Sequence, residues 1–179
     1  VSGCLQASAI TSGLTDQEPK GQDQPLTEID PFTFLSMVNK FGVEKRLPIL
    51  VHLKQALSLS ADLPKDFDGV PSSYSQNAWF FPYRFERKPA HIPALWALFD
   101  EALTGELTGD NFKRALDIPY NGVIKITHGL FWVNPNAFLP INKFTKPRIE
   151  AMGIDPSFTD AAGYQSVVRA VRARIGTGF

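Results

Sequence analysis

The chain has 179 residues and a formal net charge of zero, because 18 Lys and Arg residues balance 18 Asp and Glu residues. A hydrophobic content of 44% is enough for one sizeable core and one principal domain. The neutral balance excludes the global positive field of strongly basic nucleic-acid binders, so any nucleic-acid contact must come from local patches.

The single cysteine, Cys4, cannot form an intrachain disulfide. No Cys/His cluster with metal-ligand spacing surrounds His52, His91 or His128, so we predict no metal site and no cofactor. The first four residues (VSGC) look like a lipoprotein cleavage box, but no apolar segment precedes them. No apolar run reaches the roughly 18 to 20 residues that span a bilayer. These features favour a soluble, cytoplasmic protein over an anchored one.

Residues 1–28 are expected to be a flexible leader or linker, and residues 29–179 a recognition domain. Residues 15–28 are polar and contain two prolines and a glycine, a composition that buries too little apolar surface to order itself. After them, Asp30 and Pro31 form a helix-start signal. Apolar residues at helical spacing predict a helix up to Gly42, and a second helix is expected over residues 43–59.

Residues 62–77 are rich in Pro, Gly, Asp and Ser and predict a loop. The aromatic run at residues 78–85 predicts a short strand that ends or bulges at Pro82. Helical spacing returns over residues 93–103, 110–116 and 160–175. Asn121 and Gly122 indicate a turn before a strand at residues 123–126, and prolines predict irregular chain around residues 135–147. We therefore expect a helix-rich α+β fold, in which four or five helices pack around a few short strands.

No motif for catalysis is present. The sequence lacks a Gly-rich phosphate loop, a nucleophile elbow and a zinc-binding helix, so we expect no enzymatic activity in this domain. A small hydrolase would require a pocket in which His128 or His91 meets a nucleophile. Asp66 and Asp68 lack the further acidic ligands of a calcium loop and indicate a turn.

The aromatic run leaves two interpretations open. Its rings, which include Trp79 and Tyr83, either pack a core or offer one face as a stacking platform for a base. The cations Arg84, Arg87 and Lys88 follow directly, as a groove that tracks phosphates would need, although an ordinary solvated loop has the same composition.

Two further basic segments lie later in the chain. Lys143, Lys146 and Arg148 are interleaved with Phe144. A third set, Arg169, Arg172 and Arg174, lies on the predicted last helix, where charge usually marks only a solvated face. Sequence does not decide whether the basic segments converge on one surface.

Several ordered motifs between residues 29 and 154 resemble the N-terminal region of McrB-like proteins, the AAA+ motor subunits of modification-dependent restriction systems. The motifs are IDPFTF at residues 29–34, DFDGVP at 66–71, NAWFF at 77–81, LWALF at 95–99 and GLFWVNP at 129–135. The resemblance implies a specificity domain that works with an NTP-hydrolysing ring and a separate nuclease subunit, neither of which is in this chain. Some such domains read methylated cytosine by extruding the base.

One segment departs from the family pattern. Relatives continue after the last motif with Leu-Asp and then Asn-Arg, whereas residues 141–148 read INKFTKPR and are more basic. This departure puts in doubt whether the segment works as it does in relatives.

From these patterns we predict recognition of double-stranded DNA, methylated or unmodified, on behalf of a restriction motor. The predicted contact residues combine rings for stacking with cations for phosphates: Trp79, Tyr83, Arg84, Arg87, Lys88, Lys143, Lys146 and Arg148. The alternative is a protein-interaction domain that docks the motor to its nuclease or to a phage protein, which the neutral charge and an exposed apolar patch would favour.

Overall fold

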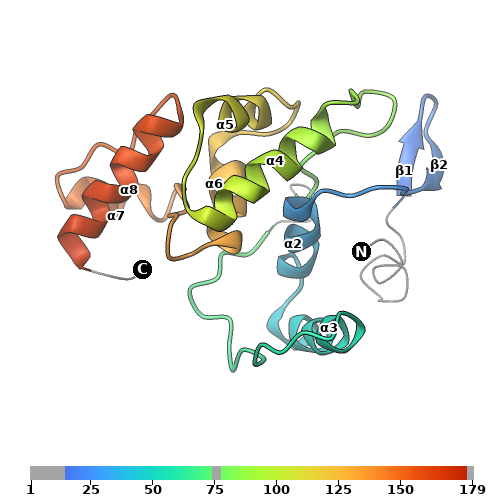
Figure 1. The fold of residues 1–179 in the computed structure, drawn as a ribbon, viewed down its shortest axis with the longest axis horizontal. Helices are drawn as coiled ribbons and strands as arrows, with labels where there is room; N and C mark the ends of the chain where they lie inside the picture. Colours follow the sequence, from blue (N-terminus) through green and yellow to red (C-terminus); the bar gives the residue numbers. More distant parts are fainter. Residues whose placement is uncertain (1–14, 74–77, 177–179) are drawn as a thin grey trace. The chain divides into compact units, whose positions relative to one another are not determined.

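The structure, a computed structural model, describes residues 15–73 and 78–176, and its chain divides into two compact units between Lys88 and Pro89. Within the described residues it has seven α-helices and one two-stranded antiparallel sheet (Figure 1). The predicted helix-rich α+β class is therefore confirmed. Cys4 with its cleavage-box pattern, and Asn77 of the NAWFF motif, lie outside the described residues.

The described part of unit 1 begins with a hairpin of β1 (Thr15–Glu18) and β2 (Gln22–Pro25), which pair antiparallel with Thr15 opposite Pro25. Lys20 and Gly21 connect the strands with φ angles of 82° and 75°, the left-handed region that tight hairpin turns use. The expectation of an unstructured segment at residues 15–28 is thus wrong over the hairpin. The segment is polar, as its composition indicates, but residues distant in sequence, Arg84 and Arg87, bind Asp16 of the hairpin and stabilise it.

Two helices follow in unit 1, α2 (Pro31–Asn39) and α3 (Val43–Ala56), both predicted. Asp30 caps α2, since its Oδ1 accepts hydrogen bonds from the backbone N–H groups of Phe32 and Thr33 at 2.8 and 3.0 Å. The Phe32 ring stacks on Phe80 with centroids 5.6 Å apart. A second apolar cluster joins the helices and consists of Met37, Val38, Leu53 and Ala78.

Arg46 of α3 anchors the loop at residues 62–73. Its buried guanidinium donates to the carbonyl oxygens of Phe41 and Asn39 and to Ser72 Oγ, at 2.7 to 2.9 Å. It also lies over the Phe67 ring at 5.4 Å. Burial lowers the pKa of Arg46. The described part of the predicted loop, residues 62–73, contains no helix or strand.

The predicted strand at residues 78–85 is wrong. The backbone N–H of Phe80 donates to Thr33 Oγ1 at 2.8 Å, and that of Arg84 donates to Asp16 Oδ1 at 2.7 Å. These amides therefore bond to side chains instead of to a neighbouring strand, and Pro82 has no N–H to donate. Residues 83–87 form turns, so the aromatic side chains do not alternate across a sheet.

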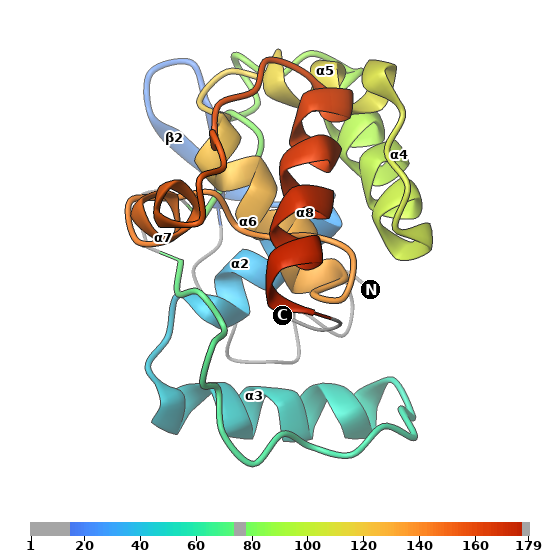
Figure 2. The same ribbon diagram turned by 90° about the vertical axis from the view of Figure 1, so that its left-hand side faces the viewer.

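Unit 2 is helical throughout its regular structure (Figures 1 and 2). Its elements are α4 (His91–Thr104), α5 (Gly109–Leu116), α6 (Val123–Val133), α7 (Lys146–Ala151) and α8 (Ala161–Ile175). Helix α4 packs against α5 and α6, and α5 also packs against α8. The predicted helices at α4, α5 and α8 are confirmed.

The core of unit 2 is centred on Tyr164 of α8, which is fully buried. Its ring is nearly parallel to those of Phe112 and Phe138, with centroids 5.9 and 6.2 Å away. The hydroxyl donates to the carbonyl of Leu139 at 2.8 Å and accepts from the N–H of the same residue at 3.1 Å. Burial raises the pKa of Tyr164 well above its ordinary value.

The predicted strand at residues 123–126 is wrong as well, because this segment is the first turn of α6. The run of β-branched residues favours a strand locally. However, the fully buried Ile126 and Leu130 are four residues apart, which places them on one face of a helix. The six-residue α7 likewise forms inside the stretch that prolines predicted to be irregular, with Pro147 at one of its first two positions.

Candidate functional site

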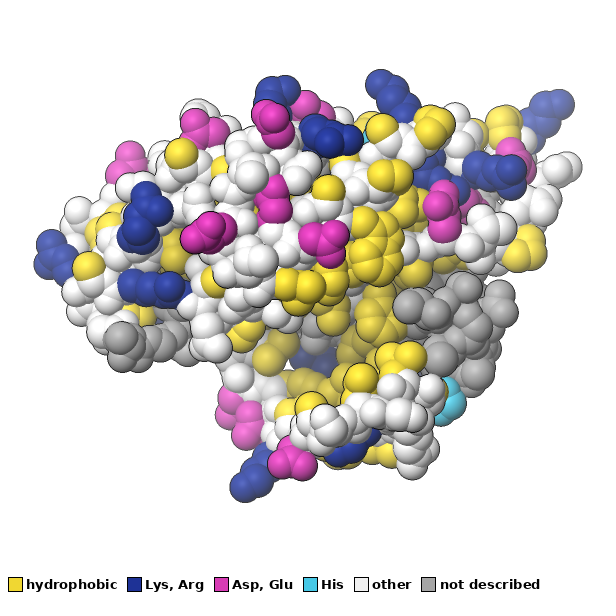
Figure 3. Space-filling model, viewed as in Figure 1, with side chains coloured by type: hydrophobic (Ala, Val, Ile, Leu, Met, Phe, Trp, Pro, Cys, Tyr) yellow, Lys and Arg dark blue, Asp and Glu magenta, His cyan; other side chains and the backbone are white. Residues whose placement is uncertain are grey.

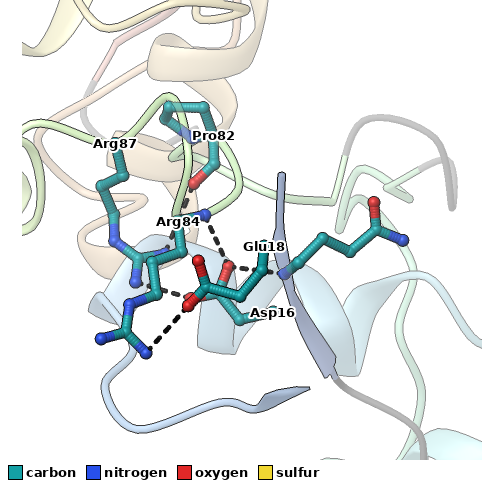
Figure 4. A network of polar contacts seen from close by, with 6 residues as sticks. Asp16, Glu18, Pro82, Arg84 and Arg87 are labelled. Carbon is teal, nitrogen blue, oxygen red and sulfur yellow. Dashed lines mark hydrogen bonds and ion pairs between the residues drawn. The ribbon is translucent and has the colours of Figure 1, made fainter. Parts of the chain in front are cut away.

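The turn at residues 82–88 of unit 1, named here the aromatic turn, is fixed by Asp16 of β1 (Figure 4). One carboxylate oxygen of Asp16 accepts the backbone N–H of Arg84, and the other accepts the guanidinium of Arg87 at 2.6 Å. The Arg87 guanidinium also donates to the carbonyl of Pro82 and lies over the Phe81 ring at 5.0 Å. The Asp16 and Arg87 side chains are only 3% and 8% exposed, so this ion pair is a buried support for the turn.

The aromatic turn holds two rings and a cation at the surface. Tyr83 and Phe85 are 38% and 47% exposed and stack on each other with centroids 6.3 Å apart. Arg84 lies between them in sequence, with its side chain 59% exposed. The half-buried Trp79 lies beside Tyr83 at 6.1 Å, so the structure brings these two predicted contact residues together. Exposed rings beside a cation can stack on a flat π system and bind an anion.

The Arg84 guanidinium has an exposed ion pair with Glu18 of β1 at 3.3 Å. An exposed pair of this kind stabilises a protein by about 1 kcal/mol or less, because water and salt screen it. A phosphate oxygen could therefore replace Glu18 as the partner of Arg84 at little cost. Lys88 is exposed as well, whereas Arg87 is directed to Asp16 and does not offer its charge to a ligand in this conformation.

The second basic segment of the predicted site lies in unit 2 at residues 142–148, a turn that leads into the first residues of α7 and is named here the basic turn. The backbone N–H groups of Phe144 and Thr145 donate to Asn142 Oδ1 at 2.8 and 3.1 Å. Thr145 Oγ1 donates to the carbonyl of Pro140 and accepts the N–H of Asn142. The buried Ile141 and Ile149 fix both ends. The predicted cations Lys143, Lys146 and Arg148 are exposed on this turn.

His128 of α6 anchors the basic turn. Because Oδ1 of Asn142 accepts two backbone N–H groups, its amide nitrogen faces His128 Nε2 at 2.8 Å. The ring nitrogen must therefore accept this hydrogen bond, which requires a neutral imidazole protonated on Nδ1. Burial lowers the pKa of His128 below its ordinary value of 6.5, and the donated hydrogen bond acts in the same direction.

We expect acidification to release the basic turn from α6. The stability contributed by neutral His128 is complete above pH 6.5 and is lost as the pH falls through the lower folded pKa. An NMR titration should give a His128 midpoint below 6.5, and N142A should raise that midpoint. An unchanged midpoint in N142A would show that the amide does not hold the imidazole in its neutral form.

The third basic segment lies on α8, where Arg169 and Arg174 are exposed and Arg172 is half-buried. On the face of unit 2 shown in Figure 3, several Lys and Arg side chains lie over the helices near the C-terminus. Elsewhere on this view, basic and acidic side chains are intermixed.

We also looked for a cation site, a metal site and a membrane-spanning helix among the described residues. Asp66 Oδ1 accepts the N–H of Asp68 and Gly69 has a φ of 79°, which confirms the expected turn. No group of three or more His, Cys, Asp or Glu residues that could hold a metal ion occurs among residues 15–73 and 78–176. Over the same residues, no helix has both the length and the apolar character to cross a bilayer.

Sequence reasoning missed the residues that position the site. The polar composition around Asp16 predicts a flexible leader, and Asn142 stands out in the sequence only as part of the departure from the family pattern. Phe85 belongs to the aromatic run for which a core role and a stacking role stay open, and Phe144 stands among the cations of the second basic segment, but neither ring is among the predicted contact residues. A short polar segment with several carboxylates, far in sequence from a basic partner, gives no local signal of which one forms an ion pair with a residue about seventy positions away.

The fold and the two turns define a helix-rich α+β protein that presents aromatic and basic side chains from fixed loops. The chain belongs to the family described as a domain of unknown function (DUF8425), which matches residues 7–177. No curated protein matches the chain. No solved structure matches it either.

Proposed function

We propose that this chain is a DNA-recognition domain of a restriction motor similar to McrB-like proteins. Its ligand would be double-stranded DNA, methylated or unmodified, in the cytoplasm. Its other partners would be the AAA+ motor domain of the same protein and a nuclease subunit. In this proposal the domain acts by binding and carries no catalytic residue or cofactor. The motif resemblance and the two turns support it.

The observation that carries the proposal is the aromatic turn. Two stacked, exposed rings flank an exposed arginine, and a buried ion pair fixes the backbone beneath them. Arginine and aromatic side chains in one rigid element can combine a phosphate contact with base stacking. Rigidity matters because a ligand then does not have to order the turn on binding.

The basic turn adds a second surface of the same chemistry in unit 2. It presents Lys143, Lys146 and Arg148 around one exposed ring, with no acidic residue between the first and last of these cations. Its backbone is fixed by Asn142 and Thr145. Each unit by itself therefore presents cations and an exposed ring from a fixed loop, a combination that suits phosphates and bases.

We expect R84Q to weaken DNA binding and to flatten its dependence on salt. Loss of one phosphate contact should reduce the slope of log affinity against log salt by about 1. The measurement is fluorescence anisotropy with matched unmodified and cytosine-methylated duplexes across salt concentrations. K65Q, the same change of charge at an exposed position of unit 1, is the control and should keep the wild-type slope. Equal slopes for all three proteins would remove Arg84 from the interface, and no binding at low salt would refute the proposal.

One observation favours the rival function of protein docking. Helix α4 exposes Trp96 and Leu103, which are 39% and 57% exposed, and the half-buried Phe99 makes an edge contact with Trp96. Apolar side chains at this spacing can form a stripe that a partner covers. Failure of the chain to bind DNA, combined with loss of nuclease binding in W96D, would establish docking as its role.

A further inference from the structure

Phe144 is the single ring of the basic turn, and 67% of its surface is accessible. Exposed phenylalanine is ordinary on mobile loops, but here the backbone on both sides is fixed. Its own N–H donates to Asn142 Oδ1, and Thr145 next to it bonds to the carbonyl of Pro140. The turn therefore holds an apolar ring in water without burying it.

The surroundings of the ring are cationic. The Lys143 ammonium lies over the Phe144 ring at 4.9 Å, and Lys146 and Arg148 are exposed on the same turn. A flat apolar surface within a positive field is complementary to a nucleobase attached to a phosphate chain. An anionic membrane would also attract the cations, but stable insertion requires a broad apolar face, and this turn offers a single ring.

An intact duplex cannot use such a ring fully, because each base face is covered by its stacked neighbours. Base faces become available only in single strands, at mismatches, or where a base leaves the helix. We propose that Phe144 stacks on exposed base faces, so that the basic turn selects single-stranded or locally unpaired DNA over intact duplex. This inference rests on the proposed DNA-binding function and names the form of DNA that this turn reads.

The test compares wild type, F144A, F144L and F144W on two DNA probes in fluorescence anisotropy. One probe is a single-stranded oligonucleotide, and the other is a duplex closed by hairpins at both ends, which leaves no terminal base face. F144A and F144L should weaken single-strand binding about tenfold and change duplex binding by less than about twofold. F144W keeps a flat ring at this position and should bind the single strand as tightly as wild type does. F144L keeps an apolar side chain but removes the flat ring, so it distinguishes stacking from a nonspecific apolar contact.

Two control variants separate this inference from the proposed function. K146Q should weaken binding to both probes, because it removes a phosphate contact. W96L removes an exposed ring elsewhere in unit 2 and should affect neither probe.

If K146Q weakens both probes while F144A weakens neither, or weakens both equally, the stacking inference is refuted and DNA binding stands. If wild type binds neither probe at low salt, both proposals fail. Phe144-dependent binding to vesicles of phosphatidylserine and phosphatidylcholine, without an effect on the single strand, would replace the inference with membrane attachment.

Discussion

D16A should destabilise unit 1 by about 3–5 kcal/mol, the largest effect that we expect from one surface-proximal substitution. The Arg87 guanidinium is 8% exposed, and its carboxylate partner is removed. A buried charge without its partner retains its full desolvation penalty. The backbone N–H of Arg84 loses its acceptor in the same variant.

The measurement is urea unfolding followed by tryptophan fluorescence. The chain has three tryptophans, and Trp79 is the one in unit 1, so a W96F/W132F background makes the signal specific to this unit. E18A is the matched control, since it removes the exposed partner of Arg84 in the same hairpin and should change stability by less than about 1 kcal/mol. The double variant D16A/R87M removes both charges and should recover part of the loss. Equal stability of D16A and E18A would contradict the supporting role of Asp16.

The same ion pair explains a limit of sequence reasoning about the site. Arg84 and Arg87 are three residues apart and look equivalent in the sequence, yet one side chain is 59% exposed and the other 8%. Their difference depends on Asp16, which is distant in sequence and belongs to a segment whose composition predicts no structure. A local basic pattern can therefore predict a charged region but not which charges face a ligand.

The helices that were predicted correctly share a strong local signal. Helix α2 has its capping carboxylate and proline at its start. Helix α8 repeats valines at helical spacing, and these valines are buried in the core. The two strands predicted at residues 78–85 and 123–126, which do not form, lack such a combination of local and core signals. At residues 78–85 aromatic content suggested β structure, but the amides of Phe80 and Arg84 are satisfied by Thr33 and Asp16 from distant segments. Tertiary partners overrode local propensity there.

Replacement of Asp30 should remove a pH dependence of stability of about 3 kcal/mol, which corresponds to the shift of its pKa from 3.8 to about 6. Burial raises this pKa, because the charged carboxylate loses its solvation, while hydrogen bonds from Thr33 and Phe32 oppose the shift. The second oxygen of Asp30 is buried without a hydrogen-bond partner. The folded state therefore binds the proton more tightly than the unfolded state. The stability from this residue is complete below pH 3.8 and is lost as the pH rises through about 6.

D30N tests this directly, because asparagine keeps a capping oxygen for the N–H groups of Phe32 and Thr33 but does not titrate. The difference in unfolding free energy between wild type and D30N should fall by about 3 kcal/mol between pH 2 and pH 7, of which about 2 kcal/mol falls between pH 4 and pH 7. D160N is the matched control, since Asp160 caps α8 by accepting the N–H of Gly163 from an exposed position. D30A should lose about 1–2 kcal/mol more than D30N at either pH, because two buried N–H groups lose their acceptor. If wild type and D30N show parallel pH profiles, Asp30 does not change its protonation state over this range, and water or a neighbouring group must stabilise its charge.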